Sequence, residues 1–188
     1  AEVYIADFKG GADFSKVWHE KCRMCFTEED LLYTLNQLVA VLEYRKKALK
    51  ELGSPNIDAY NETTENKLPR LIFACDEVAE LLDRTGRGKE DKERLAQIEN
   101  KLATLARLGR AFGIHLILAT QRPDATIIPG QIRNNMDFRV CGRADNVLSQ
   151  IILDNTSAAE QIPKDARGRF ITGDGTVFQG YLFDEGQL

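Results

Sequence analysis

The stretch RLIFACDEVAELL, residues 70–82, decides the fold. Its apolar run, residues 71–75, has the length and composition of a buried strand, and two adjacent acids, Asp76 and Glu77, precede a short helical pattern. Nucleotide-hydrolysing folds use such acids to hold magnesium and a water molecule beside a phosphate. The alternative is a helix start whose acids only complement the helix dipole. The stretch raises the hypothesis of a nucleotide site, which also requires a loop that binds phosphate.

Strand-like and helix-like segments alternate on both sides of this stretch. Strands are expected at residues 3–8, 22–26, 71–75, 115–120 and 138–142. Helices are expected at residues 28–52, 78–82, 94–108 and 144–153, and a hairpin turns at residues 173–175. The first long helix has a clear start, because the Thr27 hydroxyl is followed by three acids. The alternation predicts an α/β fold with a mostly parallel sheet and flanking helices, in a single domain over residues 1–188.

The charge balance restricts the partners of the chain. With 25 basic and 29 acidic residues, the net charge is −4, and this balance does not indicate the broad basic surface of a nucleic-acid binder that relies on electrostatics alone. Contacts to DNA through a few loops, repeated in several copies around a duplex, are compatible with this charge. No apolar run has the length of a membrane span, and the first residues show no signal-peptide pattern.

The four cysteines are interpreted as buried structural thiols. Cys22 and Cys25 have the spacing of a zinc or redox pair, but the sequence contains no second pair to complete a metal site. Cys75 and Cys141 lie within apolar strand-like runs. We therefore assign no metal to the cysteines.

No phosphate-binding loop of the form G-x-x-x-x-G-K-S/T occurs in the sequence. Gly88-Lys89 is the only glycine–lysine pair, and Glu90 follows it where serine or threonine is required. In a parallel α/β NTPase this loop belongs to a βαβ unit of on the order of 30 residues. We therefore expect a fold that is truncated at its N-terminus, with the phosphate loop upstream of residue 1.

A longer match lies further along the chain. Residues 110–123, RAFGIHLILATQRP, resemble the motor domain of FtsK/SpoIIIE-type DNA translocases, whose pattern is close to R-A-x-G-I-H-L-x-L-A-T-Q-R-P. IRNN at residues 132–135 takes the place of the I-K-A-N segment of this family. YNE at residues 60–62 and RADNVLSQIILD at residues 143–154 extend the resemblance over nearly the whole chain. The resemblance implies a RecA-like P-loop NTPase fold, with ATP and Mg²⁺ as ligands and double-stranded DNA as partner.

Two departures from the family pattern refine this expectation. Residues 155–171 replace the G-A-E-x-L-L-G-x-G-D-M-L segment of the family, and residues 6–11, ADFKGG, stand where chromosome translocases read D-P-K. Both variations look more like the coupling ATPases of conjugative elements than the chromosome-segregation motors. Type VII-like secretion ATPases of the same superfamily, which move proteins, are an alternative, and so is a non-catalytic module that assembles a ring.

The resemblance gives roles to residues at strand ends. Asp76 is expected to hold Mg²⁺ through water, and Glu77 to orient or polarise the attacking water. Thr120 and Gln121 end the next strand and reach the same sheet edge if the strands are parallel, where either side chain can bond a γ-phosphate or water as a sensor. The alternative is an ordinary strand end that passes into a proline turn.

Further candidates lie at other loops. Arg110 is the candidate arginine finger, donated in trans to a neighbour's nucleotide, because a guanidinium offers a fixed fork of donors; Arg107 is the alternative, and either could be a solvated arginine at a helix end. Asp7 and Lys9 follow the first strand near the predicted nucleotide edge, where a loop pair in water is equally expected. His115 opens an apolar strand and is interpreted as structural.

Contacts to DNA should come from loops that project into a ring's central channel. The candidates are Arg84, Arg87 and Lys89 after the Asp-Glu helix, and Arg133 in the GQIRNN segment. Phosphate contacts position a protein on DNA without reading its sequence, as a translocating motor requires. The alternative is that these charges only solvate their loops.

The resulting hypothesis is a partial FtsK/SpoIIIE-type motor domain of an ATP-driven double-stranded DNA translocase, for conjugation or chromosome segregation. We expect a homo-hexamer on the cytoplasmic side, with the parent protein anchored in the plasma membrane by another region. Since the phosphate loop is absent, the chain by itself should hydrolyse ATP poorly.

Overall fold

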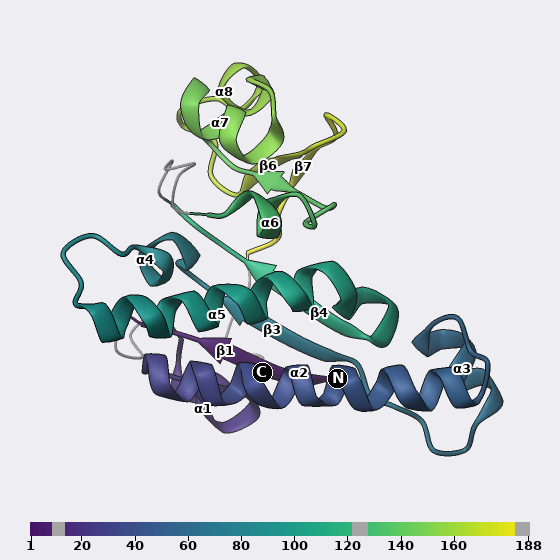
Figure 1. Cartoon of the computed structure of the whole chain (residues 1–188). Coiled ribbons are helices and arrows are strands. Elements are labelled where there is room, and N and C mark those ends of the chain that lie inside the picture. The colour runs from purple at the N-terminus through teal and green to yellow at the C-terminus, as the bar shows by residue number, and fades with distance from the viewer. Residues whose placement is uncertain (9–13, 122–127, 183–188) are drawn as a thin grey trace. The chain divides into compact units, whose positions relative to one another are not determined.

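The computed structural model describes residues 1–8, 14–121 and 128–182 (Figure 1). The chain divides into two compact units, Ala1–Thr120 and Gln121–Leu188. The first unit contains a four-stranded parallel sheet, and the second contains a three-stranded antiparallel sheet.

All four strands of the first unit run parallel. They are β1 (Glu2–Ala6), β2 (Arg23–Cys25), β3 (Leu71–Cys75) and β4 (Ile114–Leu118), in the spatial order β2-β1-β3-β4. At their carboxyl ends Ala6 lies opposite both Cys25 and Cys75, and Cys75 lies opposite Leu118. The predicted parallel sheet is confirmed, and the residues that follow the four strands lie along one edge.

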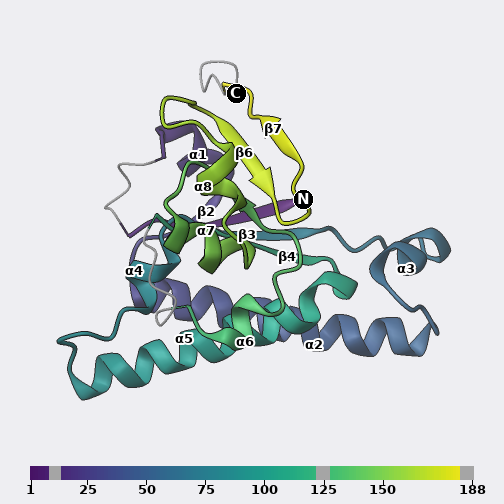
Figure 2. The ribbon, with the colours of Figure 1, turned by 90° about the horizontal axis from the view of Figure 1, so that it is seen from above.

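Two long helices, α2 (Glu28–Glu51) and α5 (Lys89–Leu108), run side by side along one face of this sheet (Figures 1 and 2). Their buried side chains recur every three or four residues, which is the period of one helix face. The apolar ones are Leu31, Leu35, Leu38, Leu42, Leu49, Leu95, Ile98, Leu102 and Leu105. The predicted start of α2 is confirmed, because the Thr27 hydroxyl accepts from the Asp30 N–H at 3.1 Å and the Thr27 N–H donates to the Asp30 carboxylate at 3.2 Å.

Shorter helical segments connect these elements. They are α1 (Lys16–Lys21), α3 (Ile57–Thr63), α4 (Val78–Leu82) and the 3₁₀ helix η1 (Gly109–Phe112). No helix is predicted from the sequence for α3, which nevertheless has a side-chain cap, the Asn56 oxygen accepting from the Ala59 N–H at 2.9 Å. Within the described residues, no helix combines the length and the apolar character needed to cross a bilayer.

Arg45 links α2 through hydrogen bonds to the amino ends of two strands. Its side chain is 2% exposed. Nη1 donates to the Phe112 carbonyl at 2.7 Å, and Nη2 donates to the Pro69 carbonyl at 2.6 Å. Because these carbonyls lie just before β4 and β3, Arg45 helps to fix where the two strands begin.

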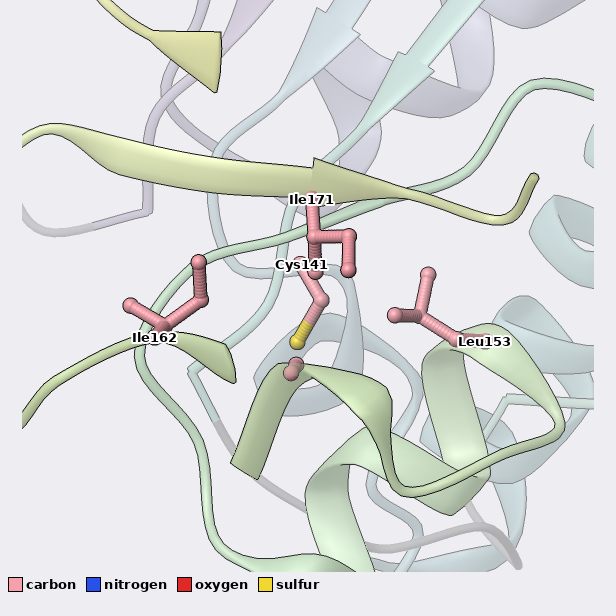
Figure 3. Packing of buried hydrophobic residues seen from close by; sticks show 5 residues of the cluster. Cys141, Leu153, Ile162 and Ile171 are labelled. Carbon is pink, nitrogen blue, oxygen red and sulfur yellow. The ribbon is translucent and has the colours of Figure 1, made fainter. Parts of the chain in front are cut away.

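The second unit combines short helices with its small sheet. Its elements are α6 (Gly130–Arg133), β5 (Val140–Cys141), α7 (Asn146–Leu153), α8 (Ser157–Gln161), β6 (Arg169–Thr172) and β7 (Val177–Gln179). A core cluster packs between the sheet and the helices α7 and α8 (Figure 3). Its members are Cys141, Leu153, Ala158, Ile162 and Ile171.

The sheet of the second unit is antiparallel throughout, in the order β5-β6-β7. The hairpin predicted at residues 173–175 is confirmed, and its turn includes Gly175, whose φ of 86° favours glycine. The strand predicted at residues 138–142 forms as β5, but it pairs antiparallel with β6, since Ile171 lies opposite Cys141 and completes the small core.

Candidate active site

The carboxyl edge of the parallel sheet brings together three of the predicted acids. Asp7 follows β1, and Asp76 and Glu77 follow β3, in neighbouring strands that end in register. The Asp7 side chain is 1% exposed, and its N–H donates to the Cys25 carbonyl at 3.0 Å. Asp76 and Glu77 are half-buried. In open α/β sheets this edge is where ligands bind.

Glu77 is held by the neighbouring strand. The Thr120 hydroxyl donates to Glu77 Oε1 at 2.5 Å, a distance typical of a charge-assisted hydrogen bond. Glu77 occupies the N-cap position of α4, with φ −129° and ψ 75°, yet its side chain makes no capping hydrogen bond. The carboxylate is therefore bonded to the end of β4 and not to the first turn of its own helix.

Two backbone hydrogen bonds keep this pair in place. The Ala119 N–H donates to the Cys75 carbonyl, and the Val78 N–H donates to the Ala119 carbonyl, both at 2.9 Å. They extend the β3–β4 pairing past the ends of the strands, on both sides of the acids. The chain segments that carry Glu77 and Thr120 are thus joined directly through Ala119.

Cys75 is the last residue of β3 and directly precedes the acids. Its thiol is free and buried, and burial raises its pKa to about 12. Cys25 and Cys141 are also buried free thiols, as predicted, whereas Cys22 is only half-buried. Burial raises the pKa of each of these thiols as well.

The described acids do not by themselves form a complete metal site. In the described part of the chain no group of three or more His, Cys, Asp or Glu side chains is placed to hold a metal ion. Mg²⁺ keeps several waters and is usually bound through one or two carboxylates and the phosphates of a substrate. Asp76 and, on the adjacent strand, Asp7 are the carboxylates at this edge. The magnesium role of Asp76 stays a prediction.

Two other nucleotide candidates are placed differently. Lys9 lies outside the described residues. Gln121 is the first residue of the second unit, where it lines a cavity of about 360 Å³ together with Arg143, Leu148 and Lys164, among others. The sensor role predicted for Gln121 therefore stays a prediction.

The arginine-finger candidates are remote from Glu77 within one copy. Arg110 is an exposed residue of η1, which precedes β4, and Arg107 is exposed in the last turn of α5. Both lie at the amino edge of the sheet, and the five residues of β4 put about 15 Å between that edge and the acids. The arginine-finger role of either residue therefore stays a prediction.

His115, at the same amino edge, is half-buried, and its Nε2 lies 3.3 Å from Arg70 Nη1. Burial, together with the positive charges of Arg70 and Arg110, lowers the pKa of His115. The structural role predicted for this histidine stays a prediction.

The basic candidates for DNA contact differ in their surroundings. Arg84 pairs with Glu99, and Arg87 pairs with Glu28 and also donates to the Asp83 carbonyl at 2.9 Å. Lys89 is different, because its side chain is 91% exposed and its ion pair with Glu93 is long, at 3.9 Å.

Arg133 is half-buried at the end of α6. Its carbonyl accepts from Arg139 Nη2 at 3.3 Å. Arg139 also donates to the Met136 carbonyl at 3.0 Å and pairs with Asp154 at 2.6 Å. Sequence reasoning missed this arginine, because it lies inside a predicted strand and carries no motif of its own.

Residues 7–125 match the model of the FtsK/SpoIIIE family. The chain belongs to the FtsK/SpoIIIE family. The matched range contains the acids, the Thr120 partner of Glu77 and the arginine-finger candidates. The resemblance drawn from residues 110–123 is confirmed.

Relatives of this FtsK/SpoIIIE chain include proteins named DNA translocase FtsK. The chain is 33% identical over 159 residues to that of Chlamydia pneumoniae, covering 77% of this chain and 19% of the relative. It is 37% identical over 130 residues to that of Chlorobaculum tepidum, covering 68% of this chain and 15% of the relative. The chain thus spans only a small part of the length of these relatives.

Solved structures support the fold. The conjugation coupling protein TcpA of pCW3, in its monomer form with ATPγS, is 39% identical, with a TM-score of 0.93 over 100% of this chain and 54% of TcpA. The EccC ATPases 2 and 3 of Thermomonospora curvata, solved with a signal sequence peptide, are 23% identical, with a TM-score of 0.71 over 96% of this chain and 32% of EccC, a likeness of fold alone. The FtsK/SpoIIIE chain has the predicted α/β P-loop ATPase fold.

Proposed function

We propose that this chain is part of an ATP-driven motor that translocates double-stranded DNA, and that its setting is conjugation. The observation that carries the proposal is the Glu77–Thr120 pair beside Asp76, at the carboxyl edge of a parallel sheet. The whole-chain likeness to a conjugation coupling protein, at 39% identity, supports conjugation over chromosome segregation.

The residues at this edge would divide the work of hydrolysis. Asp76, supported by Asp7, would hold Mg²⁺ through water, and the bound ion would neutralise charge on the β- and γ-phosphates. Glu77 would accept a hydrogen bond from the attacking water and aim it at the γ-phosphorus, opposite the bond to the departing ADP. The hydrogen bond from Thr120, at the end of β4, restricts the carboxylate to one orientation, as this role requires.

ATP turnover by the natural full-length protein, with and without linear duplex DNA, tests the function. DNA should stimulate turnover, and Glu77→Gln, which keeps the size of the side chain but removes its charge, should abolish it. Turnover that is indifferent to DNA would move the assignment to protein export. No turnover in the natural protein would favour a non-catalytic module that assembles a ring.

We also propose that the motor is a homo-hexameric ring in which Arg110 of one copy serves the nucleotide on the next. Since Arg110 and Glu77 lie at opposite sheet edges, head-to-tail packing is the arrangement that brings them together. Arg110→Ala and Glu77→Gln should each be inactive alone. When mixed they should regain turnover, because roughly a quarter of the interfaces in a random ring then pair an intact Glu77 with an intact Arg110.

No recovery in that mixture would exclude donation in trans by Arg110, and the same mixture with Arg107→Ala tests the alternative arginine. Native mass spectrometry of the full-length protein with nucleotide would give the copy number. Recovery of that protein in the membrane fraction, with this domain open to protease from the cytoplasmic side, would test the proposed membrane anchor and location.

Among the predicted DNA contacts, we propose Lys89 and Arg133 as the ones that neutralise phosphate. Loss of one phosphate contact should weaken binding evenly across sequences and reduce the salt slope by about 1. Lys89→Ala and Arg133→Ala should show this change in duplex binding. Lys47→Ala, a change at an exposed lysine on α2, is the matched control and should leave the slope unchanged.

A further inference from the structure

We propose that Thr120 is a positioning residue for Glu77 and does not itself contact the γ-phosphate. The inference rests on the proposed function, because it assumes that Glu77 orients the attacking water. It departs from the sensor role expected from the sequence, in which Thr120 would bond a γ-phosphate or a water.

The inference follows from the number of hydrogens that the Thr120 hydroxyl can donate. A threonine hydroxyl has a single hydrogen to donate. That hydrogen is directed at Glu77 Oε1, 2.5 Å away, in a bond between a neutral donor and a charged acceptor. The same hydrogen cannot also be donated to a phosphate oxygen, so a phosphate contact by Thr120 would require this bond to break.

Backbone hydrogen bonds around the pair keep Thr120 opposite Glu77 at the edge of the sheet. Ala119, the residue before Thr120, donates to the Cys75 carbonyl and accepts from the Val78 N–H, both at 2.9 Å. Val78 is 0% exposed, so the segment after Glu77 is anchored in the core. Thr120 therefore faces Glu77 from a position that neither segment can leave without breaking backbone bonds.

The Glu77 side chain has several rotatable bonds and makes no capping hydrogen bond on its own helix. A catalytic group must be held within a few tenths of an ångström, and a displacement of about 1 Å can cost about 100-fold in rate. The Thr120 hydroxyl supplies a second point of attachment at the far end of the Glu77 side chain.

The test compares variants of the natural full-length protein by steady-state ATP turnover. Thr120→Val keeps the shape but removes the hydroxyl, and it should lower kcat about 10- to 100-fold. Its KM for ATP should change by less than about twofold, since no bond to the nucleotide is lost. Thr120→Ser keeps a hydroxyl and should retain most of the turnover.

A control variant separates this role from a general effect of removing a threonine hydroxyl. Thr104→Val removes a threonine hydroxyl that bonds the Asn100 carbonyl at 2.9 Å on α5, and it should leave turnover unchanged.

The outcomes distinguish the inference from the function on which it rests. If Glu77→Gln is inactive but Thr120→Val matches the wild type, the positioning role is wrong and the ATPase assignment stands. A Thr120→Val variant that mainly raises KM, or a Thr120→Ser variant as slow as the valine, would also overturn the inference. If Glu77→Gln keeps full turnover, the proposed function itself fails.

Discussion

Replacing Arg45 by methionine should loosen the amino edge of the first sheet. The guanidinium makes two short hydrogen bonds to backbone carbonyls, at 2.7 Å to Phe112 and 2.6 Å to Pro69. Hydrogen bonds to a charged group contribute about 1.5–3 kcal/mol each, so the two together stabilise by about 3–6 kcal/mol. Relief from burying a charge offsets part of this sum.

The net loss for Arg45→Met is therefore expected to be about 2–4 kcal/mol, mostly because two carbonyls are left without their donor. The loss should appear where those carbonyls lie. Amide hydrogen exchange of peptides from β3 and β4 should accelerate by about 30- to 700-fold, the rate equivalent of that free energy.

Lys47→Met is the control, because Lys47 lies two residues further along the same helix and is exposed. Its effect on the free energy of opening derived from the exchange rates should stay within about 0.5 kcal/mol. An Arg45→Met variant whose β3 and β4 peptides exchange like those of Lys47→Met would refute the reasoning, since the bonds would then contribute nothing beyond the cost of burial.

Three other predictions concern the cap of α2, a thiol and a histidine. Thr27→Ala removes the acceptor of the Asp30 N–H and should reduce the free energy of unfolding by about 1 kcal/mol, measured by denaturant titration. Cys75, whose pKa is raised to about 12, should be alkylated by iodoacetamide at pH 8 far more slowly than the half-buried Cys22, as followed by peptide mass spectrometry. The lowered pKa of His115 means that the folded state binds a proton less readily than the unfolded chain. The stability that neutral His115 contributes above the ordinary histidine pKa should therefore be lost as the pH falls through the pKa of His115 in the folded state. His115→Gln should flatten this dependence of Tm on pH.

Local patterns were sufficient to predict several elements of both units. The apolar run before Asp76 forms β3, the hydroxyl and acid pair at Thr27 and Asp30 starts α2, and the glycine-rich turn closes the hairpin of the second unit. Each of these features is decided within a few residues of chain. The parallel direction of the strands in the first unit followed from the alternation of helix and strand, whereas their spatial order was not predicted.

Contacts between distant segments were not predictable in the same way. Arg45 lies among lysines and glutamates in the sequence, and its burial depends on carbonyls at Pro69 and Phe112, far along the chain. Thr120 was expected at the right edge, but its partner was not, because a strand end does not reveal which side chain lies across from it.

The basic residues after α4 show the same limit and have a consequence for experiments. Arg87 and Lys89 are two residues apart, and the sequence alone gives no reason to assign their charges different roles. Arg87, however, pairs with Glu28 at the start of α2, whereas Lys89 is 91% exposed. Arg87→Ala removes the ion pair between α2 and the loop as well as a positive charge. Weaker DNA binding by this variant would therefore not identify a phosphate contact at Arg87. Alanine at Lys89 changes the charge with little else, and only that substitution can assign the loop to DNA.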